Sequence, residues 1–366
     1  MKAHHSARVR DYLRRKTPSA FVDARRRQRS RRDRVGGLPS WVDSDTVHAV
    51  GTELLGRTPD TFAFADLSGY KEESAALIWA RLANTRQRTF FVKRSFRGSD
   101  HYPAIKDFPG AVGPPEEWLY MQDAGRLRPY VPMIYTLIEL DDVEVHYFLE
   151  DISRSNGFRS AVVPQDIPRL IHHLLDMQEA LREWVTELPD GTATRYDDHF
   201  AAKLVDYCFD SLDAFVGVTG DKPTIEFLRR WGEISDAYLG SNPGEPMDGV
   251  HGDYRPEHLF VAPGRGRSMK AVDWEYAGLG WVHNDLASLL KKTNPEVMTS
   301  AMRLVAAHDR RFSLDEHLAM LHRFRLERCI LDAALVTRQR IAKSEHPWVS
   351  SEHFYRAYDA ASRLGS

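Results

Sequence analysis

The chain has very little cysteine. Cys208 and Cys329 are the only two cysteines among 366 residues, and they lie far apart, outside any metal-ligand spacing. So few cysteines build neither a disulfide framework nor a cysteine-based zinc site. The sequence therefore predicts a cytoplasmic protein with two reduced thiols.

Long apolar runs are also lacking. No segment approaches the roughly 18 to 20 apolar residues that a membrane span needs. The N-terminal region has no apolar stretch that would serve as the core of a signal peptide. We therefore expect neither a membrane protein nor a secreted one, and the apolar content of 42% is enough for a sizeable core.

Charge is unevenly distributed behind a net value of −2. Residues 1–40 hold 13 Lys or Arg against 3 Asp, which leaves 37 Lys or Arg and 49 Asp or Glu for the remaining chain. This basic N-terminal extension could bind nucleic acid by releasing counterions. A solvated arm is the plainer alternative. A nucleic-acid partner is expected only through this arm.

Hydrophobic periodicity predicts a β-rich first part. A capped helix is expected at Asp43–Leu55 and another at Glu116–Ala124, where Pro114 and Pro115 suit the first turn. Period-two runs with turn residues between them predict strands. These strands are Thr61–Leu67, Ala75–Ala83, Thr89–Arg94, Met133–Glu139 and Glu144–Leu149.

The second part has helical periodicity interrupted by a short β island. Helices are expected near 165–187, 197–216 and 222–239, and again after the island. The island comprises Val250–His251, Leu259–Val261 and Met269–Asp273. This order predicts an α+β fold with two lobes, a β-rich lobe at 41–152 and a larger, mostly helical lobe at 153–366.

The island carries a dense set of polar residues at fixed spacing. His251-Gly252-Asp253 is followed by Pro256, then by Val272-Asp273-Trp274-Glu275, then by Asp285-Leu286-Ala287. This ordered set resembles the aminoglycoside phosphotransferase and choline-kinase-like family, which has a protein-kinase-like fold. The resemblance implies an ATP-dependent phosphotransferase that acts on a hydroxyl of a small molecule, such as an antibiotic or a sugar-like or amino-alcohol metabolite.

The resemblance assigns roles to residues of the island. Asp253 would be the catalytic carboxylate that orients the acceptor hydroxyl, and Asp273 would bind Mg²⁺ against the phosphates. Taken singly, each would be read as a turn residue or strand-end cap. His251 would shape the catalytic loop by hydrogen bonding, and Asp285 would anchor its backbone, with a helix N-cap as the alternative for Asp285.

The first lobe would hold the nucleotide, which is ATP with GTP as the alternative. Lys93, at the end of Phe90-Phe91-Val92-Lys93, resembles the catalytic lysine that contacts the phosphates. Glu116 is preferred over Glu117 as its partner, because apolar Leu119 and Tyr120 follow Glu116 at helical spacing.

Two further segments would bind nucleotide through their position in the fold. Ser68 and Gly69 lie between two predicted strands, where the family places a loop over the phosphates. The backbone of Glu150 and Ile152 would meet the adenine edge at the hinge between the lobes.

One residue departs from the family pattern. The family has Asn five residues after the catalytic Asp, as a metal ligand, whereas this chain has His258. Mg²⁺ prefers oxygen ligands and imidazole suits softer ions, so the site would use Asp273 alone for Mg²⁺ or would favour Mn²⁺ through His258. The alternative function is a pseudokinase or nucleotide-binding module whose basic arm docks a nucleic-acid or ribosomal partner.

Deleting residues 1–34 should leave phosphotransfer intact, because the arginine-rich arm lies outside the lobes that the motifs define. Turnover and thermal stability of the truncated and full-length proteins would be compared directly. Loss of folding in the truncated protein would show instead that the arm packs on the enzyme.

Overall fold

A computed structural model gives the conformation of residues 38, 41–66, 75–82, 87–96, 107–110, 114–121, 125–140, 144–153, 156–162, 165–262, 269–343 and 351–364. These residues fall into two compact units, one formed by 1–94 with 148–150 and the other by 95–147 with 151–366. The lobe boundaries expected from the sequence, 41–152 and 153–366, stay predictions.

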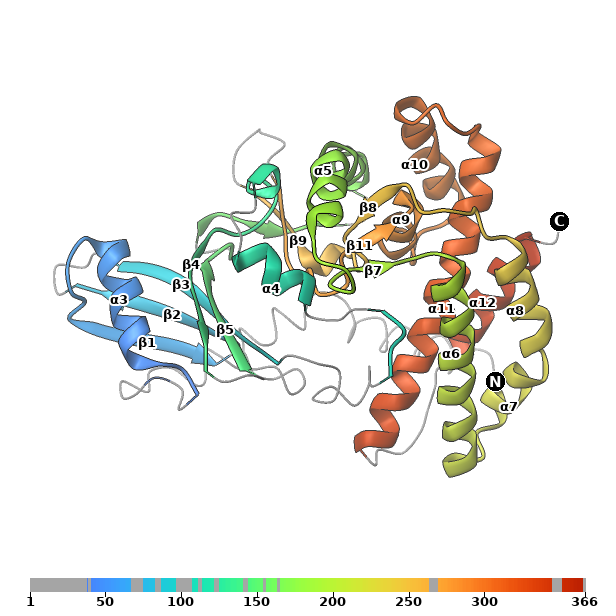
Figure 1. Ribbon diagram of the computed structural model, residues 1–366, viewed down its shortest axis with the longest axis horizontal. Coiled ribbons are helices and arrows are strands. Elements are labelled where there is room, and N and C mark those ends of the chain that lie inside the picture. Colours follow the sequence, from blue (N-terminus) through green and yellow to red (C-terminus); the bar gives the residue numbers. More distant parts are fainter. Residues whose placement is uncertain are drawn as a thin grey trace, which may run out of the picture. The chain divides into compact units, whose positions relative to one another are not determined.

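The first unit is built on an antiparallel meander (Figure 1). Its strands are β1 (Thr61–Asp66), β2 (Ala75–Arg81) and β3 (Gln87–Phe96). The register pairs Thr61 with Arg81 and Ala75 with Lys93. The five-stranded sheet has the order β1-β2-β3-β5-β4, in which β5 (Glu144–Glu150) contributes residues 148–150 to this unit and β4 (Ile134–Glu139) belongs to the second unit. All five strands agree with the sequence prediction to within a few residues.

Helix α3 (Ser44–Leu55) packs on this meander. Asp43 caps its start by accepting from Thr46 N, and Gly56 ends it in the left-handed region at φ 73°. The helix approaches the strands closely at Gly51, where an added Cβ would lie 3.2 Å from that of Ala80. This small residue therefore sets the helix-to-sheet distance.

The second unit is mostly helical, as the sequence predicts, and its longer helices pack around short strands (Figure 1). Its helical segments are α4 (Pro114–Met121), η2 (Gly125–Leu127), α5 (Ile167–Glu187), α6 (Asp198–Thr219), α7 (Lys222–Arg229), α8 (Trp231–Gly240), η4 (Pro256–His258), α9 (Val282–Leu289), α10 (Pro295–His308), α11 (Leu314–Lys343) and α12 (Ser351–Leu364).

Two small three-stranded sheets form the β island. One has the order β10 (Met269–Ala271), β9 (Leu259–Val261), β6 (Arg159–Ser160), and the other has β7 (Thr194–Arg195), β11 (Gly278–Gly280), β8 (Asp248–Val250). The sequence predicted β8, β9 and β10. It missed β6, β7 and β11, which are too short to show an alternating pattern.

The single helix predicted at 222–239 is wrong. The chain forms α7 and α8, which are separated at Arg230, a residue with φ −103° and ψ 9°. Phe227 and Trp231 pack edge to face across this break, at a centroid distance of 5.9 Å. Both aromatic side chains are buried, so tertiary packing overrides the continuous helical pattern.

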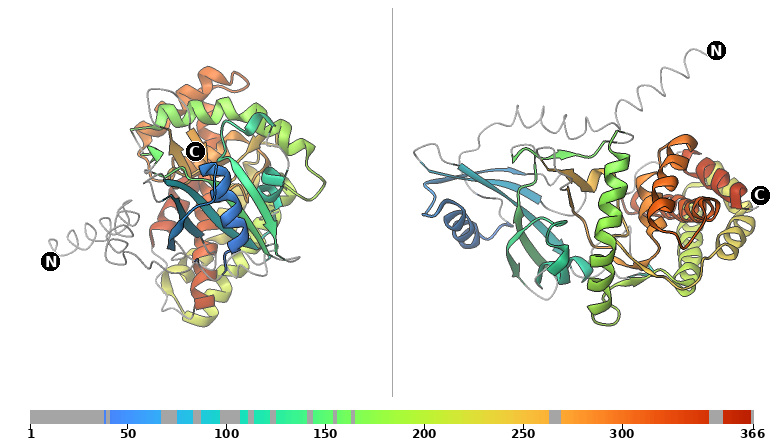
Figure 2. Two further views of the ribbon diagram at one scale, coloured as in Figure 1. Left: turned by 90° about the vertical axis from the view of Figure 1, so that its left-hand side faces the viewer. Right: turned by 90° about the horizontal axis from the view of Figure 1, so that it is seen from above.

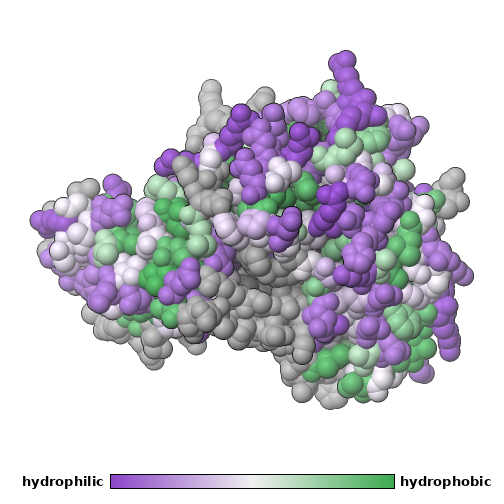
Figure 3. Space-filling model, in the orientation of Figure 1, coloured by the Kyte–Doolittle hydropathy of each residue, from purple (hydrophilic) through white to green (hydrophobic). Residues whose placement is uncertain are grey.

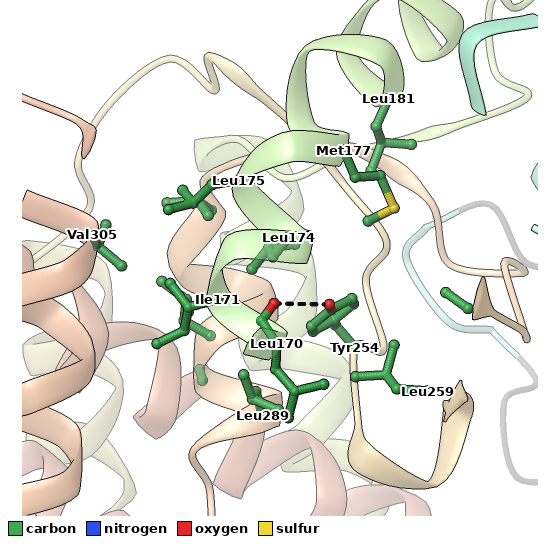
Figure 4. Packing of buried hydrophobic residues seen from close by; sticks show 14 of the residues in the cluster. Leu170, Ile171, Leu174, Leu175, Met177, Leu181, Tyr254, Leu259, Leu289 and Val305 are labelled. Carbon is green, nitrogen blue, oxygen red and sulfur yellow. Dashed lines mark hydrogen bonds between the residues drawn. The ribbon is translucent and has the colours of Figure 1, made fainter. Parts of the chain in front are cut away.

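The core beneath the loop that contains Tyr254 lies along α5 (Figure 4). Leu170, Ile171 and Leu174 are fully buried on one face of this helix. They pack with Leu289 of α9 and Val305 of α10 in one cluster. The view from above in Figure 2 shows α5 as one straight helix, so a single rigid element carries this face.

The face of the second unit that Figure 3 shows is largely polar. In the view of Figure 3, hydrophilic residues predominate over its helices and hydrophobic ones are scattered among them. In the part of the chain that the structure describes, no helix has both the length and the apolar character needed to cross a bilayer.

Candidate active site

The loop after β8 holds the predicted catalytic residue, and Gly252 allows its tight course. Gly252 has φ 79°, and an added Cβ would lie 2.2 Å from Tyr276 O and 2.7 Å from Tyr196 Oη. A side chain at this position would therefore clash with fixed atoms of the loop that follows Asp273. The glycine brings the backbone before Asp253 against that loop.

The same loop is held from below by Asp285 of α9. Its Oδ2 accepts from His251 N at 2.8 Å and its Oδ1 accepts from Gly252 N at 2.9 Å. The side chain is fully buried. Asp285 therefore anchors the backbone of the loop before Asp253, as predicted, and the alternative of a simple helix N-cap is wrong, because the N-cap of α9 is Trp281.

His251 is a structural part of the loop. Its Nε2 lies 3.0 Å from Val272 O, so this nitrogen donates, and its Nδ1 accepts from Asp253 N at 3.3 Å. Burial lowers the pKa of His251 to about 3, with the nearby His258 acting in the same direction. A neutral imidazole thus connects the catalytic loop to the strand end before Asp273.

Tyr254 fixes the loop to the core along α5. Its hydroxyl donates to Leu170 O at 3.1 Å (Figure 4) and lies 2.7 Å from His173 Nδ1, which donates to it. The ring is fully buried. The neighbouring His172 lies 2.5 Å from Pro168 O instead, so the two adjacent histidines have separate structural roles.

Two predicted site residues, Asp253 and Asp273, lie on either side of His258, which is itself a predicted ligand. Its Nδ1 lies 3.5 Å from Asp253 Oδ2, and its Nε2 lies 3.3 Å from Asp273 Oδ2. Asp273 stands at φ 64°, a left-handed conformation that costs a non-glycine residue on the order of 1 to 3 kcal/mol. Such strain at a carboxylate, whose side chain is 36% exposed, is typical of a functional position.

Sequence reasoning missed two arginines that bind Asp253. Arg255, two residues further along the loop, donates to Oδ2, and Arg328 of α11 donates to Oδ1. Burial by itself would raise the pKa of Asp253, but these two positive charges outweigh it and lower the pKa to about 2. Arg255 could have been suspected from its place in the motif, whereas Arg328 lies 75 residues away and has no signature.

The predicted nucleotide residues lie on other elements. Lys93 is buried on β3 in the first unit. Glu116 is buried in the first turn of α4, in the second unit, whereas Glu117 is half-buried. Their assigned roles stay predictions.

The remaining predicted positions are only partly described. Glu150 ends β5, and the buried Ile152 is the central residue of an Asx turn in which Asp151 Oδ1 accepts from Ser153 N at 2.8 Å. Ser68 and Gly69 lie outside the described residues. The adenine and phosphate contacts assigned to these four residues stay predictions.

Solved structures share the fold of this chain. A Streptococcus pneumoniae choline kinase, LicA, matches with a TM-score of 0.53 and 11% identity over 88% of this chain and 98% of its own. A Plasmodium vivax ethanolamine kinase matches with a TM-score of 0.53 and 11% identity over 91% of each chain. An aminoglycoside 2′-phosphotransferase in complex with GDP matches with a TM-score of 0.54 and 13% identity over 88% of this chain and 98% of its own. The predicted α+β, protein-kinase-like fold class is confirmed.

The sequence profile of the phosphotransferase enzyme family matches residues 80–321, which is more than half of the chain. The chain therefore belongs to this family. The predicted enzyme class, a small-molecule kinase, is confirmed with it. Among curated proteins, none matches the sequence.

The Asp285 carboxylate should make stability depend on pH. Burial raises its pKa to about 7, although the two backbone N–H groups favour the ionised form. Between the ordinary pKa of 3.8 and about 7 the folded state binds more protons than the unfolded state, so this contribution to the free energy of unfolding declines as pH rises. Over that window the slope attributable to one group reaches about 1.4 kcal/mol per pH unit.

Asp285→Asn has no such proton, so from pH 5 to pH 8 the wild type should lose stability relative to this variant. Urea unfolding at several pH values measures both, with the exposed Asp190→Asn as control. Parallel pH profiles for wild type and Asp285→Asn would contradict the raised pKa.

Proposed function

We propose that this protein transfers the γ-phosphate of ATP to a hydroxyl of a small molecule. The observation that carries this proposal is the convergence of Asp253, His258 and Asp273 on a loop anchored by Asp285, in a chain of the phosphotransferase enzyme family. Phosphoryl transfer depends on positioning and on charge neutralisation rather than on covalent chemistry by the protein. Such an arrangement supplies both.

Asp253 is suited to orient the acceptor hydroxyl. Its pKa of about 2 makes it a weak base but leaves it ionised as a hydrogen-bond acceptor. In the transfer, the acceptor oxygen forms a bond to phosphorus and the bond to the β-phosphate oxygen breaks, while the hydroxyl proton passes to solvent. The role of Asp253 is therefore alignment of the nucleophile, with little demand on its basicity.

The donor set fits a divalent cation held partly by protein. His258 Nδ1 lies 3.0 Å from the carbonyl of Asp253 and must donate to it, so in the neutral ring Nε2 carries a lone pair. His258 Nε2 lies 3.3 Å from Asp273 Oδ2, so one divalent ion would be within reach of both atoms. The metal would neutralise phosphate charge, with Asp273 and His258 as its protein ligands.

Two features limit this metal site. Arg255 Nη2 lies 3.2 Å from His258 Nε2, so the guanidinium would have to move when the imidazole binds a metal. Among the described residues, no three His, Cys, Asp or Glu side chains are grouped to hold an ion by themselves. Water and phosphate oxygens would complete the coordination, which is common for Mg²⁺ and Mn²⁺.

The proposed phosphate donor is a purine nucleoside triphosphate, and the proposed acceptor is a class of small hydroxylated molecules. Related folds include LicA, solved in complex with AMP, and the GDP complex described above, which supports ATP as the donor with GTP as the alternative. Choline, ethanolamine and aminoglycosides stand in the names of these relatives, so the proposed acceptor is a hydroxylated antibiotic, amino alcohol or sugar-like metabolite. A cytoplasmic location also stays a prediction.

The alternative is a nucleotide-binding module without turnover. It is favoured by the two arginines that occupy both oxygens of Asp253, and by His258 in the place of the family asparagine. A partner bound through the basic N-terminal arm belongs to this alternative and stays a prediction.

Asp253→Ala should lower turnover at least about a hundredfold, because it removes the group that orients the acceptor. ADP release would be measured with ATP alone and with a panel of aminoglycosides, amino alcohols and sugars, and nucleotide affinity by titration. Affinity should stay near the wild-type value in this variant, whereas Lys93→Ala should weaken it. Turnover within a few fold of wild type in Asp253→Ala would refute the assignment, and absence of turnover in the wild type across the panel would favour the alternative.

His258→Asn should shift metal preference toward Mg²⁺ over Mn²⁺, because it replaces an imidazole nitrogen with an amide oxygen. The ratio of kcat/KM in the two metals measures this shift. Glu257→Gln, at the exposed neighbouring position of the same 3-10 turn, is the matched control and should leave the ratio unchanged. An unchanged ratio in His258→Asn would mean that the imidazole is not a ligand.

A further inference from the structure

We propose that Arg328 of α11 is a positioning residue that holds the Asp253 carboxylate in the orientation needed for transfer. The proposal rests on the function proposed above. Arg328 lies outside the segment from His251 to Asp285 that carries the family motif, on a helix that is remote from it in sequence.

The contacts of Arg328 tie the loop to the helix at more than one atom. Nη2 donates to Asp253 Oδ1, and Nη1 donates to Gly252 O at 3.4 Å. On its other side, Nε lies 3.5 Å from Asp332 Oδ1, one turn along the same helix. Lys291 Nζ donates to the second oxygen of Asp332, so the guanidinium is itself oriented by an ion-pair chain.

Burial makes this contact costly to break. The side chains of Asp253 and Arg328 are 6% and 13% exposed. A buried carboxylate left without its partner is costly, so the pair stays closed in the folded protein. The planar guanidinium fork also fixes the direction of the carboxylate, which the single ammonium of a lysine would not do.

Arg255, the other partner of Asp253, is built differently. It belongs to the same loop, and its side chain is 40% exposed. The same Nη2 that donates to Asp253 Oδ2 lies 3.2 Å from His258 Nε2, so a cation bound at that nitrogen would displace the guanidinium. Arg328 thus keeps Oδ1 while Arg255 can release Oδ2 to the acceptor hydroxyl, which gives the two oxygens separate roles.

A purely structural role for Arg328 is the competing explanation, and α11 offers a matched control. Arg323 lies on the same helix, is 3% exposed and donates to Glu327 at 2.8 Å. Its guanidinium also stacks on Tyr238 at 4.4 Å. Arg323 is therefore a buried, ion-paired arginine whose partner is outside the catalytic loop.

The test compares full-length Arg328→Lys and Arg323→Lys in ATP turnover, measured as ADP release with water or a panel acceptor. Arg328→Lys should lower kcat about 10- to 100-fold, the scale of a slightly misplaced nucleophile-orienting group, with the KM for ATP within about threefold of wild type. Arg323→Lys should keep kcat per folded molecule. For Arg328→Ala, added guanidinium ion should restore part of kcat. Wild-type kcat in Arg328→Lys, or equal losses in the two lysine variants, would overturn the proposal.

A stability cycle separates this proposal from the proposed function. Arg328→Met and Asp253→Asn, singly and combined, should show coupling in urea unfolding whether or not the protein turns over ATP. If the cycle shows coupling but the wild type does not turn over ATP, the proposed function is overturned. The catalytic role of Arg328 is overturned with it, while the contact between Arg328 and Asp253 stands. If the wild type turns over ATP, the cycle shows no coupling and Arg328→Lys keeps its kcat, only the proposal for Arg328 is overturned.

Discussion

The site depends on one buried interaction, the pair of hydrogen bonds by which the Asp285 carboxylate holds the backbone N–H groups of His251 and Gly252. A fully buried carboxylate is costly, and it persists only because both oxygens have donors. These bonds fix the backbone immediately before Asp253. The position of the Asp253 backbone is thereby set from α9, and side-chain contacts then orient the carboxylate.

The remaining anchors of the loop approach from different elements. Tyr254 ties it to α5, His251 ties it to the strand end before Asp273, and Arg328 ties it to α11. Each anchor restrains a different atom, so rotation about one of them is blocked by the others. Since α5 and α11 belong to the helical core, the precision of the loop derives from packed helices rather than from its own short strands.

Features of the site that depend on residues close together in the sequence could be predicted. The family resemblance of the segment from His251 to Asp285 implied the anchored loop. The spacing predicted the convergence of Asp253, His258 and Asp273, because a short hairpin brings its ends together. Arg328 could not be predicted in this way, since the residue pattern of a long helix does not distinguish an arginine in a buried ion pair from a solvated one. The break at Arg230 was missed for a related reason, because it is stabilised by the packing of Phe227 and Trp231 rather than by a local breaker residue.

His258, which replaces the family asparagine, changes the type of ligand atom at the site but not the net charge. Asp253 and Asp273 contribute two negative charges, and Arg255 and Arg328 contribute two positive ones. A neutral imidazole at His258 leaves this balance as a neutral asparagine would. What changes is the donor atom, from an amide oxygen to a ring nitrogen whose direction is fixed by the carbonyl of Asp253. Because Arg255 shares that nitrogen with the metal position, binding of a cation and release of Asp253 Oδ2 would become coupled through a single mobile guanidinium.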